Sequence, residues 1–152
     1  REDLIRIFAL FSDERRPERV ADCIIEERTR HPIETTGQLS EILRKVSRGR
    51  KGTKYPEAPL FQAIRIEVNN EFDSIREGIE KGIRFLNPEG RICVISFHSG
   101  EDRIVKNLFR EAAQDGLVTI ITKKPVTAGV REVHANQKSR SAKLRVAERA
   151  DI

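Results

Sequence analysis

Apolar residues recur at helical spacing through the first third of the sequence. The pattern predicts one helix over Asp3–Phe11 and a second from Pro17 to about Thr29. Thr35 and Gln38 have the spacing of a capping box, in which two side chains satisfy free backbone N–H groups, so we expect a third helix to begin there. Three helices of this length predict a small helical subdomain, which we place at residues 1–54.

One long helix is predicted next, from Pro59 to about Leu86. Asn69 and Asn70 fall in its middle, where Asn is a poor helix former. Either the two residues are kept for function, or they bond a neighbouring loop, and the sequence leaves both alternatives open.

The segment Arg91–Phe97 is an almost unbroken apolar run between turn residues. Its length and β-branched content predict a central strand that is covered on both faces. His98, Ser99 and Gly100 follow directly, and helical spacing then resumes. Polar side chains would therefore lie at the carboxyl end of a buried strand, which is where open α/β sheets hold their ligands.

The last third predicts two more strands. Leu117–Thr122 forms the first of them, and Val126–Ser141, rich in Gly, Asn, Gln and Ser, is expected to be a loop. A short final strand around Leu144–Ala147 is expected at an edge of the sheet. Alternation of helices and strands over residues 55–152 predicts an α/β fold.

The chain is basic, with 29 Lys and Arg against 24 Asp and Glu, a net charge of +5 and a sequence pI near 9.5. Such a balance favours a polyanionic partner such as nucleic acid. Positive charge gathers in two segments, Arg44–Lys54 and Lys123–Arg149. The first is either a solvated loop or a phosphate contact. The second either protects an edge strand from aggregation or binds an RNA backbone.

Cysteine content and hydropathy restrict the class of protein further. Cys23 and Cys93 both fall in apolar patterns, so we expect two buried free thiols in a reducing compartment, with no disulfide and no metal site. No apolar run is long enough to span a bilayer, which predicts a cytoplasmic protein without a membrane partner. The chain lacks Met and any Gly-rich turn between a strand and a helix, so we expect a fragment whose cofactor loop lies elsewhere.

Several segments together carry a family resemblance. Leu86–Arg91 is similar to the turn before the fifth strand of Rossmann-like S-adenosylmethionine-dependent methyltransferases. With the other segments, the chain closely resembles the ribosomal RNA small subunit methyltransferase H family over nearly its whole length. These other segments are Phe61–Arg65, Val68–Glu71, Ile95–Lys106 and Ser139–Arg145. The sequence departs from the family pattern at Gly100, where Leu is expected, and at 136–138, where Asn-Pro-Arg is usual. The Gly100 departure is expected to remove an apolar contact and to loosen the start of the helix.

The resemblance implies an enzyme that N4-methylates a cytidine of 16S rRNA in the decoding region of the small ribosomal subunit. Its cofactor would be S-adenosylmethionine, but the family's cofactor loop lies earlier than any residue here, so no cofactor-binding residue is assigned. The chain would then be the carboxyl-terminal half of the Rossmann-like sheet plus a helical insert, inactive by itself. A homodimer is an open alternative for its assembly.

Candidate site residues follow from chemistry and from the resemblance. The exocyclic amine of cytosine is a weak nucleophile, so methyl transfer needs it aligned and its proton accepted. His98 could hydrogen-bond the base or merely cap the next helix, and Ser99 is expected to be the N-cap of that helix. The catalytic base stays unassigned. The substrate-binding candidates are His98, Ser99, Asn69, Arg140, Ser141, Lys143 and Arg145.

The surrounding charges divide into structural and RNA-binding candidates. Arg140, Lys143 and Arg145 are the expected phosphate contacts, beside a loop over 129–139 that would order on RNA. We expect Glu101–Arg103 to form a structural network, and Lys106 and Arg110 to be a solvated face. A non-catalytic RNA-binding or ribosome-assembly module is the alternative function, while a dehydrogenase-like domain is disfavoured by the missing fingerprint loop.

Overall fold

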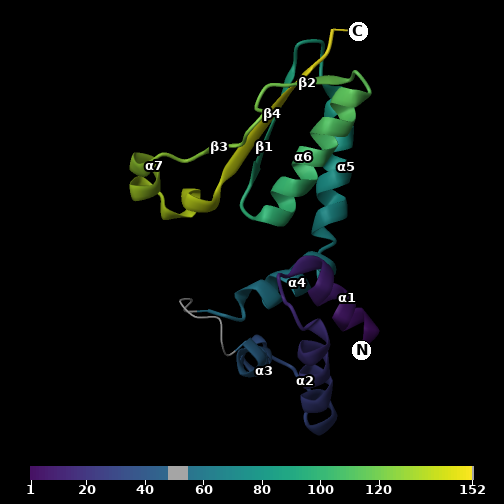
Figure 1. Cartoon of the computed structure of the whole chain (residues 1–152), viewed down its shortest axis with the longest axis vertical. Coiled ribbons are helices and arrows are strands. Elements are labelled where there is room, and N and C mark those ends of the chain that lie inside the picture. Colours follow the sequence, from purple (N-terminus) through teal and green to yellow (C-terminus); the bar gives the residue numbers. More distant parts are fainter. Residues whose placement is uncertain (48–54, 152) are drawn as a thin grey trace. The chain divides into compact units, whose positions relative to one another are not determined.

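The computed structural model describes residues 1–47 and 55–151 and divides the chain into two compact units, Arg1–Glu71 and Phe72–Ile152 (Figure 1). Among the residues described, the first unit contains helices without strands, whereas the second combines helices with a small antiparallel sheet, which confirms the predicted mixed α/β class. Most of the predicted basic loop, residues 48–54, lies outside the described residues. Within the described residues, no helix has both the length and the apolar content that a bilayer crossing requires.

The first unit contains the three helices predicted for it. They are α1 (Glu2–Phe11), α2 (Pro17–Arg30) and α3 (Thr36–Ser47), and they pack with α4 (Ala58–Val68) around an apolar core. Phe8, Leu43 and Leu60 are its largest fully buried side chains. The predicted capping box also forms, since Thr35 Oγ1 accepts from the Gln38 N–H at 3.2 Å and Gln38 Oε1 accepts from the Thr35 N–H at 2.9 Å.

A buried carboxylate joins α3 to the start of α4. Glu57 Oε1 accepts hydrogen bonds from Arg44 Nε at 2.7 Å and from the Ser40 hydroxyl at 3.1 Å. Burial by itself would raise the pKa of this carboxyl, but hydrogen bonds from its own backbone, Arg44 and Ser40 together hold the pKa below its ordinary value. Glu57 therefore stays ionised in the core and fixes the two helices to each other.

The single long helix predicted from Pro59 is wrong, because the structure breaks it into α4 and α5 (Glu71–Phe85). Asn69 ends α4, and Asn70 has a φ of 51°. Asn tolerates this left-handed conformation better than other residues with a side chain, because its short polar group bonds locally. The two asparagines thus form the turn between two helices.

The sheet of the second unit is built around its last strand. β4 (Lys143–Arg149) pairs antiparallel with β1 (Arg91–Ser96) on one side and with β2 (Val118–Ile120) and the short β3 (Val126–Thr127) on the other. The expectation that the final strand lies at an edge is wrong. Because β1 and β2 both run antiparallel to β4, they are parallel to each other, but β1 ends opposite Lys143 whereas the shorter β2 ends opposite Ala147.

Helices cover one face of this sheet. α5 and α6 (Ser99–Gln114) lie side by side against it (Figure 1), and Ile83, Phe109 and Ala147 belong to the core that they enclose. On the opposite face Cys93 and Ile95 are exposed. The predictions of a strand covered on both faces and of a buried Cys93 are therefore wrong, because both of these side chains are exposed to solvent. Both cysteines are free, as predicted, and Cys23 is partly buried.

The predicted loop over Val126–Ser141 contains regular structure. It begins with β3, continues as α7 (Val130–Ala135) and ends in the 3-10 helix η1 (Gln137–Ser141). Asn136 caps η1, since its Oδ1 accepts from the Lys138 N–H at 3.1 Å. The prediction of an irregular loop is wrong because this local capping was not recognised in a segment rich in polar residues.

Candidate functional site

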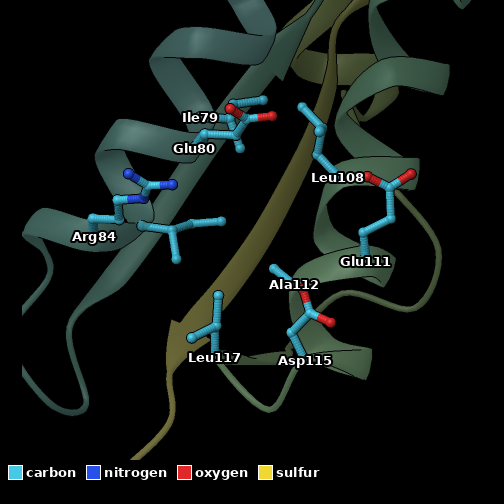
Figure 2. Close-up of a pocket in the computed structure, with 9 residues that line it drawn as sticks. Ile79, Glu80, Arg84, Leu108, Glu111, Ala112, Asp115 and Leu117 are labelled. Carbon is cyan, nitrogen blue, oxygen red and sulfur yellow. The ribbon is translucent and has the colours of Figure 1, made fainter.

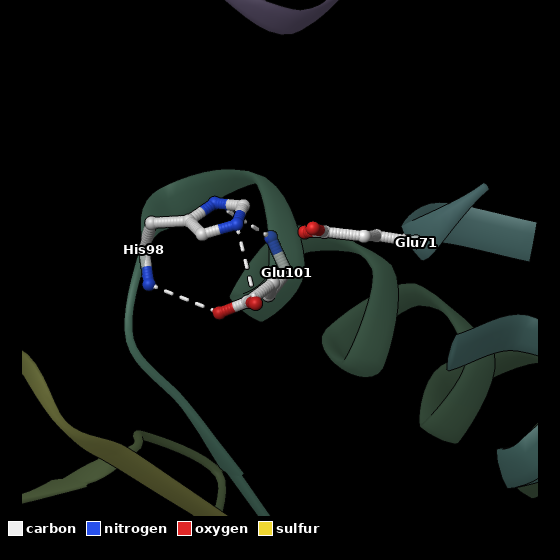
Figure 3. Close-up of side chains that lie close together, drawn as sticks. All are labelled: Glu71, His98 and Glu101. Atoms are coloured by element: carbon white, nitrogen blue, oxygen red, sulfur yellow. Dashed lines mark hydrogen bonds and ion pairs between the residues drawn. The ribbon is translucent and has the colours of Figure 1, made fainter. Parts of the chain in front are cut away.

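His98 joins the end of β1 to the start of α6. The Glu101 carboxylate accepts from the backbone N–H group of Phe97 at 2.8 Å and from that of His98 at 3.2 Å, the second of which is drawn in Figure 3. In return, His98 Nδ1 accepts from the Glu101 N–H at 3.4 Å. This reciprocal arrangement is a capping box with His98 as the N-cap. The prediction that Ser99 caps the helix is wrong, because Ser99 is already its first helical residue.

The capping bond leaves the other ring nitrogen of His98 available. Because Nδ1 accepts a hydrogen bond, a neutral ring carries its proton on Nε2. Nε2 lies 3.2 Å from Glu101 Oε1 but makes no hydrogen bond to any described residue, although the atom is buried. A buried polar atom without a hydrogen bond costs about 1–3 kcal/mol, and the Glu101 carboxylate beside Nε2 offsets part of that cost. A bound ligand with an acceptor at this position would recover that cost.

Close packing around Gly100 holds the His98 ring in place. The Phe72 and His98 ring centroids are 6.0 Å apart. A Cβ at Gly100 would lie 2.7 Å from Phe72 Cζ and 3.2 Å from the His98 ring, so a larger residue requires the Phe72 ring to move. Phe72 thus supplies the apolar contact that the absence of Leu at this position was expected to remove.

Asp102, in the first turn of α6, binds two cations of β4. Arg145 donates two hydrogen bonds to the carboxylate, at 2.7 and 3.2 Å, and Lys143 Nζ lies 3.6 Å away. The Arg145 hydrogen bond is the main reason that the pKa of Asp102 is below its ordinary value, against the opposing effect of burial. The prediction that Glu101 and Asp102 serve a structural network is confirmed, while Arg103 is exposed and takes no part in these contacts.

The structure gathers most of the predicted site residues at one edge of the sheet. Ser96, at the end of β1, pairs in register with Lys143, at the start of β4. His98 and Ser99 follow Ser96, while η1 precedes Lys143. Arg140, Ser141, Lys143 and Arg145 therefore belong to the same edge as His98 and Ser99.

These side chains differ in how far solvent reaches them. Arg140 and Ser141 are exposed, Lys143 is about one-third exposed and Arg145 is buried. Asn69 belongs to the first unit instead, where its amide donates to Glu71 Oε1 at 3.3 Å. Whether any of the seven contacts a substrate stays a prediction.

A pocket of about 300 Å³ lies between α5 and α6 (Figure 2). Ile79, Leu108 and Leu117 contribute to its apolar lining. Its charged lining residues are Glu80, Arg84, Glu111 and Asp115. Because acids outnumber the one cation, this pocket would repel a phosphate, and we do not assign it to RNA.

Comparison with known proteins places the chain among methylases. The family model described as the MraW methylase family matches residues 1–150. The chain is 48% identical over 149 residues to the ribosomal RNA small subunit methyltransferase H of Persephonella marina, and 44% identical over 163 residues to that of Caldicellulosiruptor bescii. Each match covers 97% of this chain, but 51% and 53% of the respective relative. The chain thus spans about half the length of these relatives.

Proposed function

This chain belongs to the MraW methylase family, and from that premise we propose that it forms part of an rRNA methyltransferase. The resemblance noted in the sequence is confirmed at the level of the family. The finer proposal is methylation of the N4 atom of a cytidine in the decoding region of 16S rRNA, with this chain as the carboxyl-terminal half of the enzyme. A cytoplasmic location and a homodimeric form stay predictions.

The observation that carries the proposal is the buried ring nitrogen Nε2 of His98, which lies 3.2 Å from the Glu101 carboxylate but makes no hydrogen bond to any described residue. In the neutral ring, Nε2–H is a donor held in one orientation by the capping box, at the carboxyl end of β1. In addition to its amine, cytosine has two hydrogen-bond acceptors on the same base edge, N3 and O2. A hydrogen bond from Nε2 to either would orient the base, and orientation is the main requirement when the nucleophile is a weak amine.

S-adenosylmethionine would supply the methyl group. The described residues contain no Gly-rich turn between a strand and a helix, so we assign none of them to that cofactor. The share of the work that we propose for this chain is to bind and orient the RNA. His98 would hold the target base, while Arg140, Lys143 and the hydroxyl groups of Ser99 and Ser141 would contact the backbone around it.

The test is methyl transfer by the full-length enzyme that this proposal implies. In that enzyme, this chain follows the upstream region of its relatives. The substrate is 16S rRNA in small ribosomal subunits, and the product is analysed by mass spectrometry of digested nucleosides. We expect His98→Ala to lower kcat by about 10- to 100-fold, because loss of base orientation is costly, with cofactor affinity unchanged. His134→Ala is the matched control, since His134 is exposed and its ring, as far as the structure describes the chain, bonds Val130 O in the same helix.

Two results would count against the proposal. If the His98 variant methylates as fast as the unaltered enzyme, His98 does not position the base. If the unaltered protein binds both rRNA and S-adenosylmethionine but does not methylate the rRNA, the alternative of a non-catalytic RNA-binding or assembly module would replace the enzyme.

A further inference from the structure

A second pocket, of about 320 Å³, lies between α6 and the strands β2 and β4. Its charged lining residues are all cationic: Lys106 and Arg110 from α6, Lys123 just after β2, and Arg145 from β4. Phe109 and Ile120 supply an apolar floor. We propose that this pocket binds one phosphate of an RNA strand together with the ribose attached to it. The inference rests on the proposed rRNA methyltransferase and adds an RNA contact away from His98.

Unpaired positive charge is the first argument. Asp102 already neutralises Arg145, but Lys106, Arg110 and Lys123 make no ion pair with any described residue. Lys106 and Arg110 are four residues apart on α6, a spacing at which like charges repel each other. An anion bound between them would attract both cations and so offset their mutual repulsion. The expectation that these two residues form only a solvated face missed their convergence with Lys123.

The apolar floor distinguishes this pocket from a simple anion site. Phe109 is only 2% exposed, so its ring forms a fixed surface on which a base cannot intercalate. The volume exceeds what a bare phosphate needs and accommodates a sugar against Phe109 and Ile120. Arg110 can bind two phosphate oxygens through its planar fork, while the two lysines act as point charges. This combination fits a phosphodiester with its ribose.

Hydrogen bonds keep the pocket walls in position before any ligand arrives. The N–H groups of Ile121 and Thr122 both donate to Val146 O, at 3.0 and 3.2 Å, and Thr122 Oγ1 accepts from the Val146 N–H at 2.8 Å. These bonds fix the chain that carries Lys123 against β4. A preformed site loses little conformational entropy when it binds.

The position of the pocket suits a strand that also reaches His98. β1 ends opposite Lys143, just before His98, whereas Thr122 bonds Val146, so Lys123 lies beside the middle of β4, a few residues along the strand from the end that carries His98. Arg145 lines the pocket, and Asp102 connects it to the first turn of the helix that His98 caps. One RNA strand that runs along β4 would contact both places.

The first experiment measures affinity for a decoding-region fragment of 16S rRNA at several salt concentrations, using the same full-length enzyme. In a Lys106→Gln, Arg110→Gln double variant, loss of two contacts should lower the salt slope by about 1.4, and the affinity at about 0.1 M salt by about 25-fold, because each single-strand contact contributes a slope of about 0.7. The matched control is Arg84→Gln, an exposed arginine in the acidic pocket of α5 and α6. Its affinity and slope should not change.

The outcomes separate this inference from the proposed function. If the double variant keeps the affinity and salt slope of the unaltered enzyme, the pocket does not bind RNA, while the methyltransferase proposal stands. If the unaltered enzyme neither binds nor methylates rRNA, the proposed function fails, and the inference with it.

A second experiment needs no variant and therefore does not depend on folding of an altered protein. RNA bound to the unaltered enzyme should protect Lys106 and Lys123 from reductive methylation, while Lys81 on α5 should stay reactive. Unprotected lysines in the complex would overturn the inference. Cytidine monophosphate is tested in parallel, because a free nucleotide shares this chemistry. Equal protection by the mononucleotide and the RNA at equal concentration would overturn the assignment to an RNA strand.

Discussion

Replacement of Asp102 by Asn tests whether the ion pair between α6 and β4 holds the candidate site together. Asn keeps the size of the side chain and one acceptor oxygen but removes the charge that neutralises Arg145. The Arg145 side chain is 8% exposed and that of Asp102 is 13% exposed, so the variant leaves a buried cation without a counter-charge. Lys143 also loses its attraction to Asp102 in this variant, but its side chain is one-third exposed, so water screens that attraction and its loss adds little to the cost.

The expected cost follows from this burial. Removal of one partner of a buried pair destabilises proteins by about 3–5 kcal/mol. We expect the lower end, about 3 kcal/mol, because the amide of Asn still accepts one of the two hydrogen bonds from Arg145. Adding Arg145→Met should recover about 2 kcal/mol, since the second change removes the unpaired charge and keeps an apolar stem in place.

The pair also predicts a pH dependence. Because the folded state holds the pKa of Asp102 below its ordinary value, the pair contributes stability above the ordinary pKa of about 3.9, and loses it as the pH falls through the lowered folded-state pKa. Urea unfolding followed by circular dichroism, at pH 7 and at steps below pH 5, measures both effects. A change of less than about 1 kcal/mol at pH 7, or parallel acid profiles for Asp102→Asn and the unaltered chain, would refute this account.

Two further predictions concern packing and thiol exposure. Gly100→Leu should destabilise the chain by about 1–3 kcal/mol, because the new side chain displaces the Phe72 ring. Phe72→Ala in the same chain should recover part of the loss. Urea unfolding of the single and double variants measures both effects, and an unchanged stability of the Gly100→Leu variant would contradict the prediction. In the 152-residue chain, a thiol reagent should label exposed Cys93 before Cys23, since burial raises the pKa of the Cys23 thiol. Peptide mass spectrometry at successive times gives the order of labelling, and faster labelling of Cys23 would contradict the prediction.

Local patterns were sufficient where neighbouring residues determine the structure. The Thr35 and Gln38 capping box started a helix as expected, because the partners of a cap lie within one turn. The run Arg91–Phe97 likewise became β1 apart from its last residue. Between them, Asn69 and Asn70 were assigned to a helix interior because apolar spacing continues on both sides of them. Periodicity does not register a two-residue interruption when both flanking segments are helical.

Long-range pairing accounts for the remaining differences. Nothing near Leu144–Ala147 indicates that three strands pair with it, so its alternating charges were consistent with an edge strand. Arg145 was expected on the surface because the sequence does not show that its partner Asp102, 43 residues earlier, faces it. The cap of α6 is a different case, because its partners His98 and Glu101 are only three residues apart: Ser99 was expected as the N-cap because Ser is a preferred N-cap residue, whereas His98 takes that position.

Ion pairing, more than charge density along the sequence, determines which cations of this chain are available to the RNA phosphates of the proposed contact. Arg44, Arg91 and Arg145 each face a carboxylate at 2.7 Å, so each would have to break an ion pair before it could bind a phosphate fully. Lys106 and Arg110, in a segment whose sequence also contains acids, have no such partner among the described residues. Salt-dependent affinity for RNA counts only the charges that exchange counterions for phosphates. In the proposed RNA contact, Lys106 and Arg110 should therefore contribute more to binding than Arg145, although Arg145 lies in the more basic stretch of sequence.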